Sequence, residues 1–272
     1  MTSVIVRPER RIAHIAVSER FEERIFHFPR SVVTNGKWAT LPPAAASVYA
    51  VLGVHANYRS HIAFASQERI SMMAGYSRVS VSKGSKILEG RELILVTRGA
   101  GPGNTSFPGP ITVTNKYYVR PRGGDWFTFD GKLLWAAGEV GAWSRLGPSA
   151  RKLYVASRAM VYGEAWDQFW RDDEKRHGLY EWFDSADNSF DLESRVEWFE
   201  LSGVDYPVPP NCFYIRLTRR ASLRLRALAG IRDKRTFDNA LEDLIEKRLM
   251  AQFGYEGEEA LLPIPYPSAW GR

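Results

Sequence analysis

The arrangement of apolar and polar positions repeats within this chain of 272 residues. In two stretches, apolar or small residues recur at spacings of three and four. These positions are Val81, Gly84, Ser85 and Leu88 in the first stretch, and Phe237, Ala240, Leu241 and Leu244 in the second. Such spacing places side chains on one face of a helix. The pattern therefore predicts a helix buried along one side in each stretch, and its small residues indicate a close helix crossing.

A shorter helix is predicted before each of these two. Its apolar positions are Ile70 and Met73 in the first copy, and Leu225 and Leu228 in the second. Gly75 and Gly230 follow, and glycine readily adopts the left-handed conformation that ends a helix. Ser77 and Asp233 then suit the N-cap of the next helix, because their side-chain oxygens accept bonds from free backbone N–H groups. Both copies have the form of a helix-turn-helix, and they are offset by 155 residues up to the glycine and 156 after it.

Two strands joined by a loop are predicted after each helix pair. In the first copy the strands are Leu93–Arg98 and Ile111–Val119, on either side of a turn-rich loop at Gly99–Pro110. In the second copy they are Met250–Gly254 and Ala260–Ile264, with a loop near 256–259. Alternating apolar positions around glycine and proline are typical of such hairpins. A hairpin in this position is a wing.

A further repeat precedes each helix pair. The segments Trp38–Tyr49 and Trp143–Tyr154 match at an offset of 105 residues, with identical Trp, Leu, Pro, Ala and Tyr. Repeats of this kind are the signature of a duplicated structural unit. Pro43 and Pro148 suit the first turn of a helix, where the missing N–H costs nothing. Each segment is therefore predicted to begin the first helix of a small domain.

The motifs from Trp38 to Val119 resemble the winged helix-turn-helix domains common in bacterial plasmid, phage and regulatory proteins. The pair of copies is similar to plasmid replication initiators, which carry two winged-helix domains related by duplication. We therefore expect an α+β fold with two tandem winged-helix domains at 38–120 and 125–272, after an N-terminal arm at 1–37. The apolar segment Trp126–Trp135 is expected to form a strand and a helix that pack on the second domain.

The net charge of +6 conceals an uneven distribution of charged residues along the chain. Residues 164–205 hold 13 acidic and 4 basic side chains, whereas the rest of the chain holds 18 acidic and 33 basic ones. This acidic segment also carries Trp166, Trp170, Trp182 and Trp198, and it is expected to form an insertion at about 164–209 in the second domain. Two interpretations remain open: a docking surface for another protein or a second copy, or a decoration whose Trp residues bury against the domain.

The resemblance implies that the second helix of each helix-turn-helix enters the major groove of double-stranded DNA. In the first domain the expected DNA contacts are Ser77, Arg78, Ser80, Ser82, Lys83 and Lys86, with Arg98 and Lys116 flanking the wing loop. Arg78 is expected to contact bases, since arginine commonly reads guanine through two hydrogen bonds. Lys83 and Lys86 are expected to bind phosphates.

The second domain has a denser basic segment, with eight basic residues and one acid from Arg216 to Arg235. Neutralising phosphates releases counterions and gives affinity for any DNA sequence. The expected contacts here are Arg219, Arg220, Arg224, Lys234, Arg235, Thr236 and Asn239. Asn239 has the amide group that pairs with adenine.

Enzymatic chemistry finds little support in the sequence, and we expect no catalytic site, metal or cofactor. The five histidines show no metal-ligand spacing, and the single cysteine, Cys212, has no evident catalytic partner. Gly99–Gly103 lacks the Gly-Lys-Ser/Thr ending of a phosphate-binding loop. Asp184, Asp187, Asp191 and Glu193 have a spacing common in acidic loops, so they are a weak magnesium candidate.

The sequence therefore predicts a cytoplasmic, nucleoid- or plasmid-associated protein that binds specific duplex DNA and initiates replication of a plasmid or similar element. A transcriptional regulator with the same fold is the first alternative. A protein-docking module in a nucleoprotein complex is the second, with residues 164–205 contacting a second copy or a replication or regulatory protein. No membrane association is expected, because no apolar run reaches the roughly 18 residues needed to span a bilayer.

Overall fold

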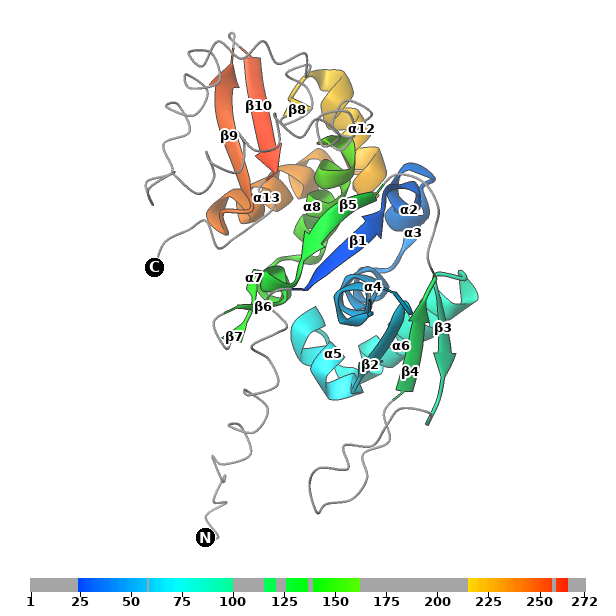
Figure 1. Ribbon diagram of the computed structural model, residues 1–272. Coiled ribbons are helices and arrows are strands. Elements are labelled where there is room, and N and C mark those ends of the chain that lie inside the picture. The colour runs from blue at the N-terminus through cyan, green and yellow to red at the C-terminus, as the bar shows by residue number, and fades with distance from the viewer. Residues whose placement is uncertain are drawn as a thin grey trace, which may run out of the picture. The chain divides into compact units, whose positions relative to one another are not determined.

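The computed structural model describes residues 24–57, 59–99, 115–120, 126–136, 139–161, 215–255 and 258–263. It has the predicted α+β composition, with helices and small sheets that divide into two compact units (Figure 1). The expectations for the arm before residue 24, for most of the first wing loop and for the acidic segment 164–205 lie outside the described residues. No helix in the described part is long and apolar enough to cross a membrane.

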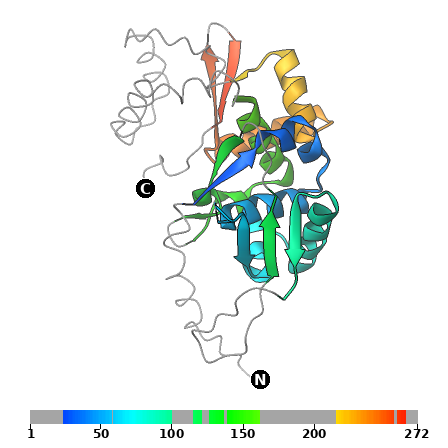
Figure 2. The same cartoon turned by 45° about the vertical axis from the view of Figure 1, so that its right-hand side comes forward.

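Unit 1 includes described residues within 24–28, 44–120 and 128–145. Its main elements are α4 (Pro43–His55), β2 (Ile62–Ala65), α5 (Gln67–Ala74), α6 (Arg78–Gly90), β3 (Ile94–Thr97) and β4 (Asn115–Val119). The antiparallel sheet has the order β2-β4-β3, so the strand before the helix pair lies beside the last strand of this sheet (Figure 2).

Unit 2 includes described residues within 29–43, 126–127 and 146–263. Its main elements are α8 (Pro148–Val161), β8 (Ile215–Arg216), α12 (Arg219–Ala229), α13 (Lys234–Glu246), β9 (Met250–Tyr255) and β10 (Glu258–Pro263), preceded by α2 (Arg30–Thr34) and α3 (Lys37–Thr40). Its antiparallel sheet has the order β8-β10-β9. Both units thus follow the order helix, strand, helix, helix, strand, strand, with the same sheet arrangement. The strands β2 and β8 complete each sheet and were not predicted from the sequence.

The remaining elements are β1 (Ile25–Pro29), β5 (Trp126–Asp130), the short 3-10 helix η2 (Gly131–Leu133), β6 (Trp135–Ala136), β7 (Glu139–Val140) and α7 (Ala142–Arg145). Strand β1 pairs with β5, and β6 pairs with β7. The strand predicted after Trp126 is present.

The core of unit 1 surrounds α4, which is buried from Ala45 to His55. The rings of Phe26 and Phe28 lie edge-on to Tyr49, with centroids 5.7 and 5.4 Å away. Helix α6 buries Val81, Gly84, Ser85 and Leu88, which are the positions that the sequence pattern predicted. A Cβ atom on Gly84 would lie only 3.2 Å from the Cα of Ala45, so the predicted close crossing joins α6 to α4.

The core of unit 2 has the same plan around α8, which packs against α12 and α13. Helix α13 buries Phe237, Ala240, Leu241 and Leu244, again as predicted. Asp243 on the same helix accepts a hydrogen bond from the backbone N–H of Gly147, with 2.7 Å between nitrogen and oxygen. This bond holds the start of α8 against α13.

The first residues of each Trp-containing repeat pack in the unit that contains the rest of the other copy. Trp38 is fully buried in unit 2, where its indole N–H donates to the carbonyl of Lys152 over 3.1 Å. The ammonium group of Lys152 in turn donates to the carbonyls of Ala39 and Leu41. The two units therefore differ from the predicted domains 38–120 and 125–272, because these buried hydrogen bonds fix residues 38–41 to α8.

The matching exchange occurs around Trp143, which is fully buried in unit 1. Its ring lies 5.0 Å from that of Phe129, nearly perpendicular to it, and α7 packs against α5. Residues 128–145 consequently pack in unit 1, whereas the sequence analysis expected the segment Trp126–Trp135 to pack on the second domain.

Candidate functional site

The turn between the two helices of unit 1 has the predicted geometry. Gly75 ends α5 in the left-handed conformation, with φ of 68°, and its N–H donates to the carbonyl of Met72. Ser77 caps α6: its hydroxyl oxygen accepts a bond from the backbone N–H of Ser80 at 3.2 Å. The hydroxyls of Ser77 and Ser80 also lie 3.0 Å apart. Two of the predicted DNA contacts thus take part in holding the first turn of α6.

The same turn occurs in unit 2 with one additional residue. Gly230 ends α12 at φ of 69°, and Asp233 caps α13. The carboxylate of Asp233 accepts bonds from both the backbone N–H and the hydroxyl of Thr236, at 2.7 and 2.9 Å. These bonds to Thr236 hold the pKa of Asp233 below its ordinary value. The hydroxyl of Thr236, a predicted DNA contact, is therefore engaged in the cap.

The outward face of α6 is a narrow stripe opposite the buried one. Val79, Lys83 and Lys86 are exposed and follow one another at spacings of four and three residues. About 3.6 residues form one turn, so these three side chains line the side that faces away from Val81 and Leu88. Within the described part of the chain, Lys83 and Lys86 make no ion pair. They are thus available to an anionic partner.

Arg78 lies beside this stripe rather than within it. Its guanidinium forms an ion pair with Glu68 of α5 at 3.1 Å, and the two side chains are 63 and 77% exposed. Such exposed pairs contribute between zero and about 1 kcal/mol. The pair therefore leaves Arg78 able to exchange Glu68 for another partner, but it directs the resting side chain toward α5.

Other predicted contacts of unit 1 lie outside this stripe. Ser82 is half-buried on α6, and Lys116 lies half-buried on β4 between Phe64 and Thr97 of the adjacent strands. Arg98, just after β3, pairs with Glu89 of α6 at 3.0 Å. The structure therefore places positive charge on α6, at the end of β3 and on the middle strand.

In unit 2 the basic residues are divided between both helices of the pair. Arg219, Arg220 and Arg224 are exposed on α12. Arg235 and Asn239 are exposed on α13, on the stripe that corresponds to Val79 and Lys83 of α6. The stripe continues with exposed Glu242 and Glu246, so its second half is acidic where that of α6 carries Lys86.

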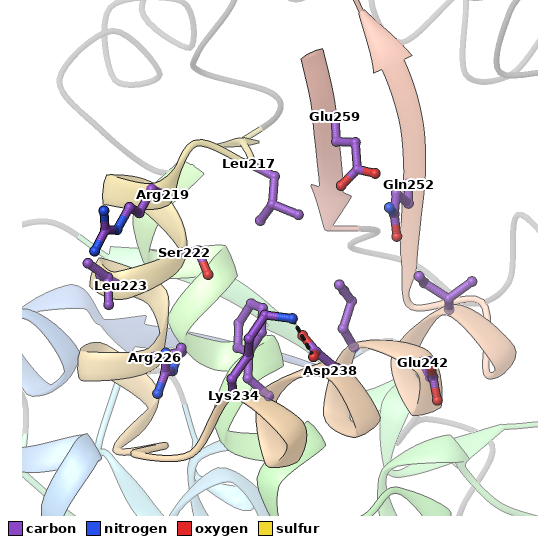
Figure 3. A pocket seen from close by; sticks show the side chains of 13 residues that line it. Leu217, Arg219, Ser222, Leu223, Arg226, Lys234, Asp238, Glu242, Gln252 and Glu259 are labelled. Carbon is purple, nitrogen blue, oxygen red and sulfur yellow. Dashed lines mark hydrogen bonds and ion pairs between the residues drawn. The ribbon is translucent and has the colours of Figure 1, made fainter.

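A groove of about 650 Å³ lies between α12, α13 and the strands β9 and β10 (Figure 3). Its wall includes Lys234 and Asp238. The ammonium nitrogen of Lys234 lies 3.0 Å from a carboxylate oxygen of Asp238, and a dashed line marks this ion pair in the figure. Arg219 and Arg226 of α12 also line the groove, and Glu242 and Glu259 contribute negative charge. The mixed charge argues against this groove as a phosphate site. The candidate site is the outward face of the second helix in each unit.

Val79 is the residue of this face that the sequence analysis missed. It was passed over because an apolar side chain is ordinarily assigned to a core. The phase of the helix contained the necessary signal, since Val79 lies opposite the midpoint of the buried positions Val81, Gly84, Ser85 and Leu88. Its side chain is 65% exposed.

No protein-family model matches the chain, and comparisons with curated proteins and with solved structures likewise give no match. Within the described residues, no group of three or more His, Cys, Asp or Glu side chains is placed to hold a metal ion. The magnesium candidate around Asp184 lies outside those residues.

Proposed function

We propose that this protein binds specific sequences of double-stranded DNA through two winged-helix units. The observation that carries the proposal is the repeated presentation of a capped second helix, whose outward face holds Lys83 and Lys86 in unit 1 and Arg235 and Asn239 in unit 2. The order of elements and of strands, the same in both units, supports the winged-helix interpretation. The major groove admits a helix of this kind.

The lengths of the side chains on α6 determine which part of the DNA each one reaches. Lysine is long and carries a point charge, so Lys83 and Lys86 suit the phosphates that border the groove. The smaller Ser80 and Ser82 allow the backbone of the helix to approach the base edges. Arg98 and Lys116 add positive charge at the wing, where a second strand of phosphates would lie.

The biological role that we propose is initiation of replication of a plasmid or similar element. It rests on the resemblance of the duplicated motifs to plasmid initiators. A transcriptional regulator would use the same surfaces, and a docking module would use residues 164–205 in addition. The recovered target sequence separates the first two, since repeated sites at a replication origin favour an initiator and a single palindrome at a promoter favours a regulator.

The first test is selection of bound sequences from a random duplex library with the full chain at physiological salt. An enriched motif is expected. Binding without enrichment that disappears as salt rises would contradict sequence-specific recognition and leave only contacts to phosphates.

Charge-removing variants test which surface binds. We expect Lys83→Ala and Lys86→Ala each to weaken binding to all duplexes alike and to lower the slope of log affinity against log salt by about 1. Arg59→Ala is the matched control, because Arg59 is exposed in the segment before β2 and not on α6. Equal salt slopes for Lys83→Ala, Lys86→Ala and Arg59→Ala would place the DNA surface elsewhere.

A further inference from the structure

An exposed valine lies at the N-terminal end of the face that we assign to DNA. Val79 is 65% exposed in the first turn of α6, and its stripe continues with Lys83 and Lys86. Single exposed apolar residues are ordinary on protein surfaces, so its exposure alone implies nothing. Its position is informative, because the first turns of a recognition helix are where base contacts concentrate.

The packing of unit 1 does not require a valine at position 79. The side of α6 that packs in the core is the opposite one. A β-branched side chain also loses rotamer freedom in a helix, so valine is a poorer helix former than alanine or arginine. Neither packing nor helix propensity favours valine here, and its exposed methyl groups are available to a partner outside the folded unit.

The neighbours of Val79 leave its methyl groups as the apolar tip of the first turn. Arg78 pairs with Glu68 on α5, and the hydroxyls of Ser77 and Ser80 are engaged with each other in the cap. The next side chain along the stripe, Lys83, is one turn further along. Because the side chain of Val79 is short, it contacts only a group that projects from the floor of the major groove toward α6.

We propose that Val79 reads the 5-methyl group of a thymine in the major groove. The inference rests on the proposed function and deepens it by naming the base that α6 selects. Thymine is the one DNA base that presents an apolar group there, and small apolar side chains are its usual partners. Valine has no hydrogen-bonding group, so it discriminates through this methyl contact alone.

The corresponding place in unit 2 carries different chemistry. Counted from the helix caps, Val79 corresponds to Arg235, Lys83 to Asn239 and Lys86 to Glu242. Arginine suits guanine, asparagine suits adenine and glutamate accepts from cytosine. The two units therefore select unlike sequences, and the complete target consists of two non-identical half-sites.

The test removes the methyl group from the DNA. After the target has been selected, each thymine in turn is replaced by deoxyuridine, and the affinity of the full chain is measured at fixed salt. Loss of one buried methyl corresponds to about fourfold weaker binding. We expect this loss at one position for the unaltered chain, and no loss there for Val79→Ser, which replaces the apolar side chain by a small polar one.

Three controls keep the outcomes distinct. Leu95→Ala removes another exposed apolar side chain, 46% exposed on β3, and should retain sensitivity to deoxyuridine. Val79→Arg places the arginine of unit 2 in α6 and should shift the selected base at that position toward guanine. Thermal unfolding of each variant confirms that it is folded.

The results separate failure of the inference from failure of the function. A selected motif whose binding is unchanged by deoxyuridine at every thymine would overturn the role of Val79 and leave specific duplex binding intact. A deoxyuridine effect that persists in Val79→Ser would also overturn it. Absence of any selected motif would overturn the proposed function itself.

Discussion

At the scale of single residues, two glycines allow the cost of a left-handed backbone to be measured apart from the cost of a steric overlap. Gly230 has φ of 69°, and a Cβ atom added there would overlap the carbonyl oxygen of Ala39 within unit 2. Gly36 has φ of 75°, but a Cβ atom would meet nothing within 4 Å. Both substitutions to alanine force a left-handed conformation, which costs about 1–2 kcal/mol. Only Gly230→Ala adds the overlap, worth about 1–3 kcal/mol more.

Chemical denaturation of both variants measures the difference. We expect the free energy of unfolding to fall further for Gly230→Ala than for Gly36→Ala. Equal losses would mean that α12 shifts away from Ala39 without cost, and that the end of this helix is held less firmly than its contacts suggest.

Residue identity also limited what the sequence predicted about the site. The charged and hydroxyl-bearing positions of α6 were recognised because their chemistry suits DNA. Val79 was not, although counting from the buried positions places it outward. The ion pair of Arg78 with Glu68 was not predictable either, since it joins two helices whose relative orientation the pattern does not specify. Side-chain type determined which positions were predicted to bind DNA, and the structure adds the exposure of Val79 and the ion pair of Arg78.

At the scale of elements, the helix pairs and the strands that follow them were predicted well because their signals are local. Caps, turn glycines and a period of 3.6 residues lie within a few positions of one another. The strands β2 and β8 have four and two residues, too short to show alternation. They exist because β4 and β10 supply backbone partners, a contact that local patterns do not encode.

The crossing of α4 and α6 gives a prediction at this scale. Gly84→Val places two methyl groups against the backbone of Ala45, whereas Gly90→Val on the same helix meets open space. Both changes replace a glycine of α6 by valine, which is a better helix former than glycine, so a loss of stability reports packing rather than helix propensity. We expect Gly84→Val to destabilise unit 1 by about 1–3 kcal/mol more than Gly90→Val in denaturant titrations, with reduced DNA binding as α6 is displaced. Similar stabilities would show that the helices separate freely.

At the scale of the whole molecule, the sequence did not predict that the first residues of each Trp-containing repeat pack in the unit of the other copy. The repeats containing Trp38 and Trp143 were recognised, and the natural assumption was that each begins its own domain. Trp38 instead bonds to Lys152, 114 positions along the chain, and Trp143 packs on Phe129. The two segments share five identical residues, but membership of a unit is decided by such long-range contacts.

Stability of the molecule should depend on pH through a buried histidine. Burial, and then the positive charges of Arg69 and Arg24, lower the pKa of His55 well below its ordinary value. His27 shifts in the same direction through burial. The unfolded chain therefore takes up protons as the pH falls below about 6.5, while folded His55 stays neutral. Stability is fully present above that pH and decreases below it, by at most about 1.4 kcal/mol per pH unit for one such group.

Urea denaturation between pH 7.5 and 5.5 measures this dependence. We expect the free energy of unfolding to decrease steadily below pH 6.5, and the decrease to be smaller in His55→Gln, which keeps a polar side chain but has no titrating group. The slope is compared rather than the absolute stability, because glutamine fits the buried site differently. His27→Gln is the control at a less buried position and should change the slope less. An unaltered slope in His55→Gln would assign the pH dependence to other groups and show that folding does not lower the pKa of His55.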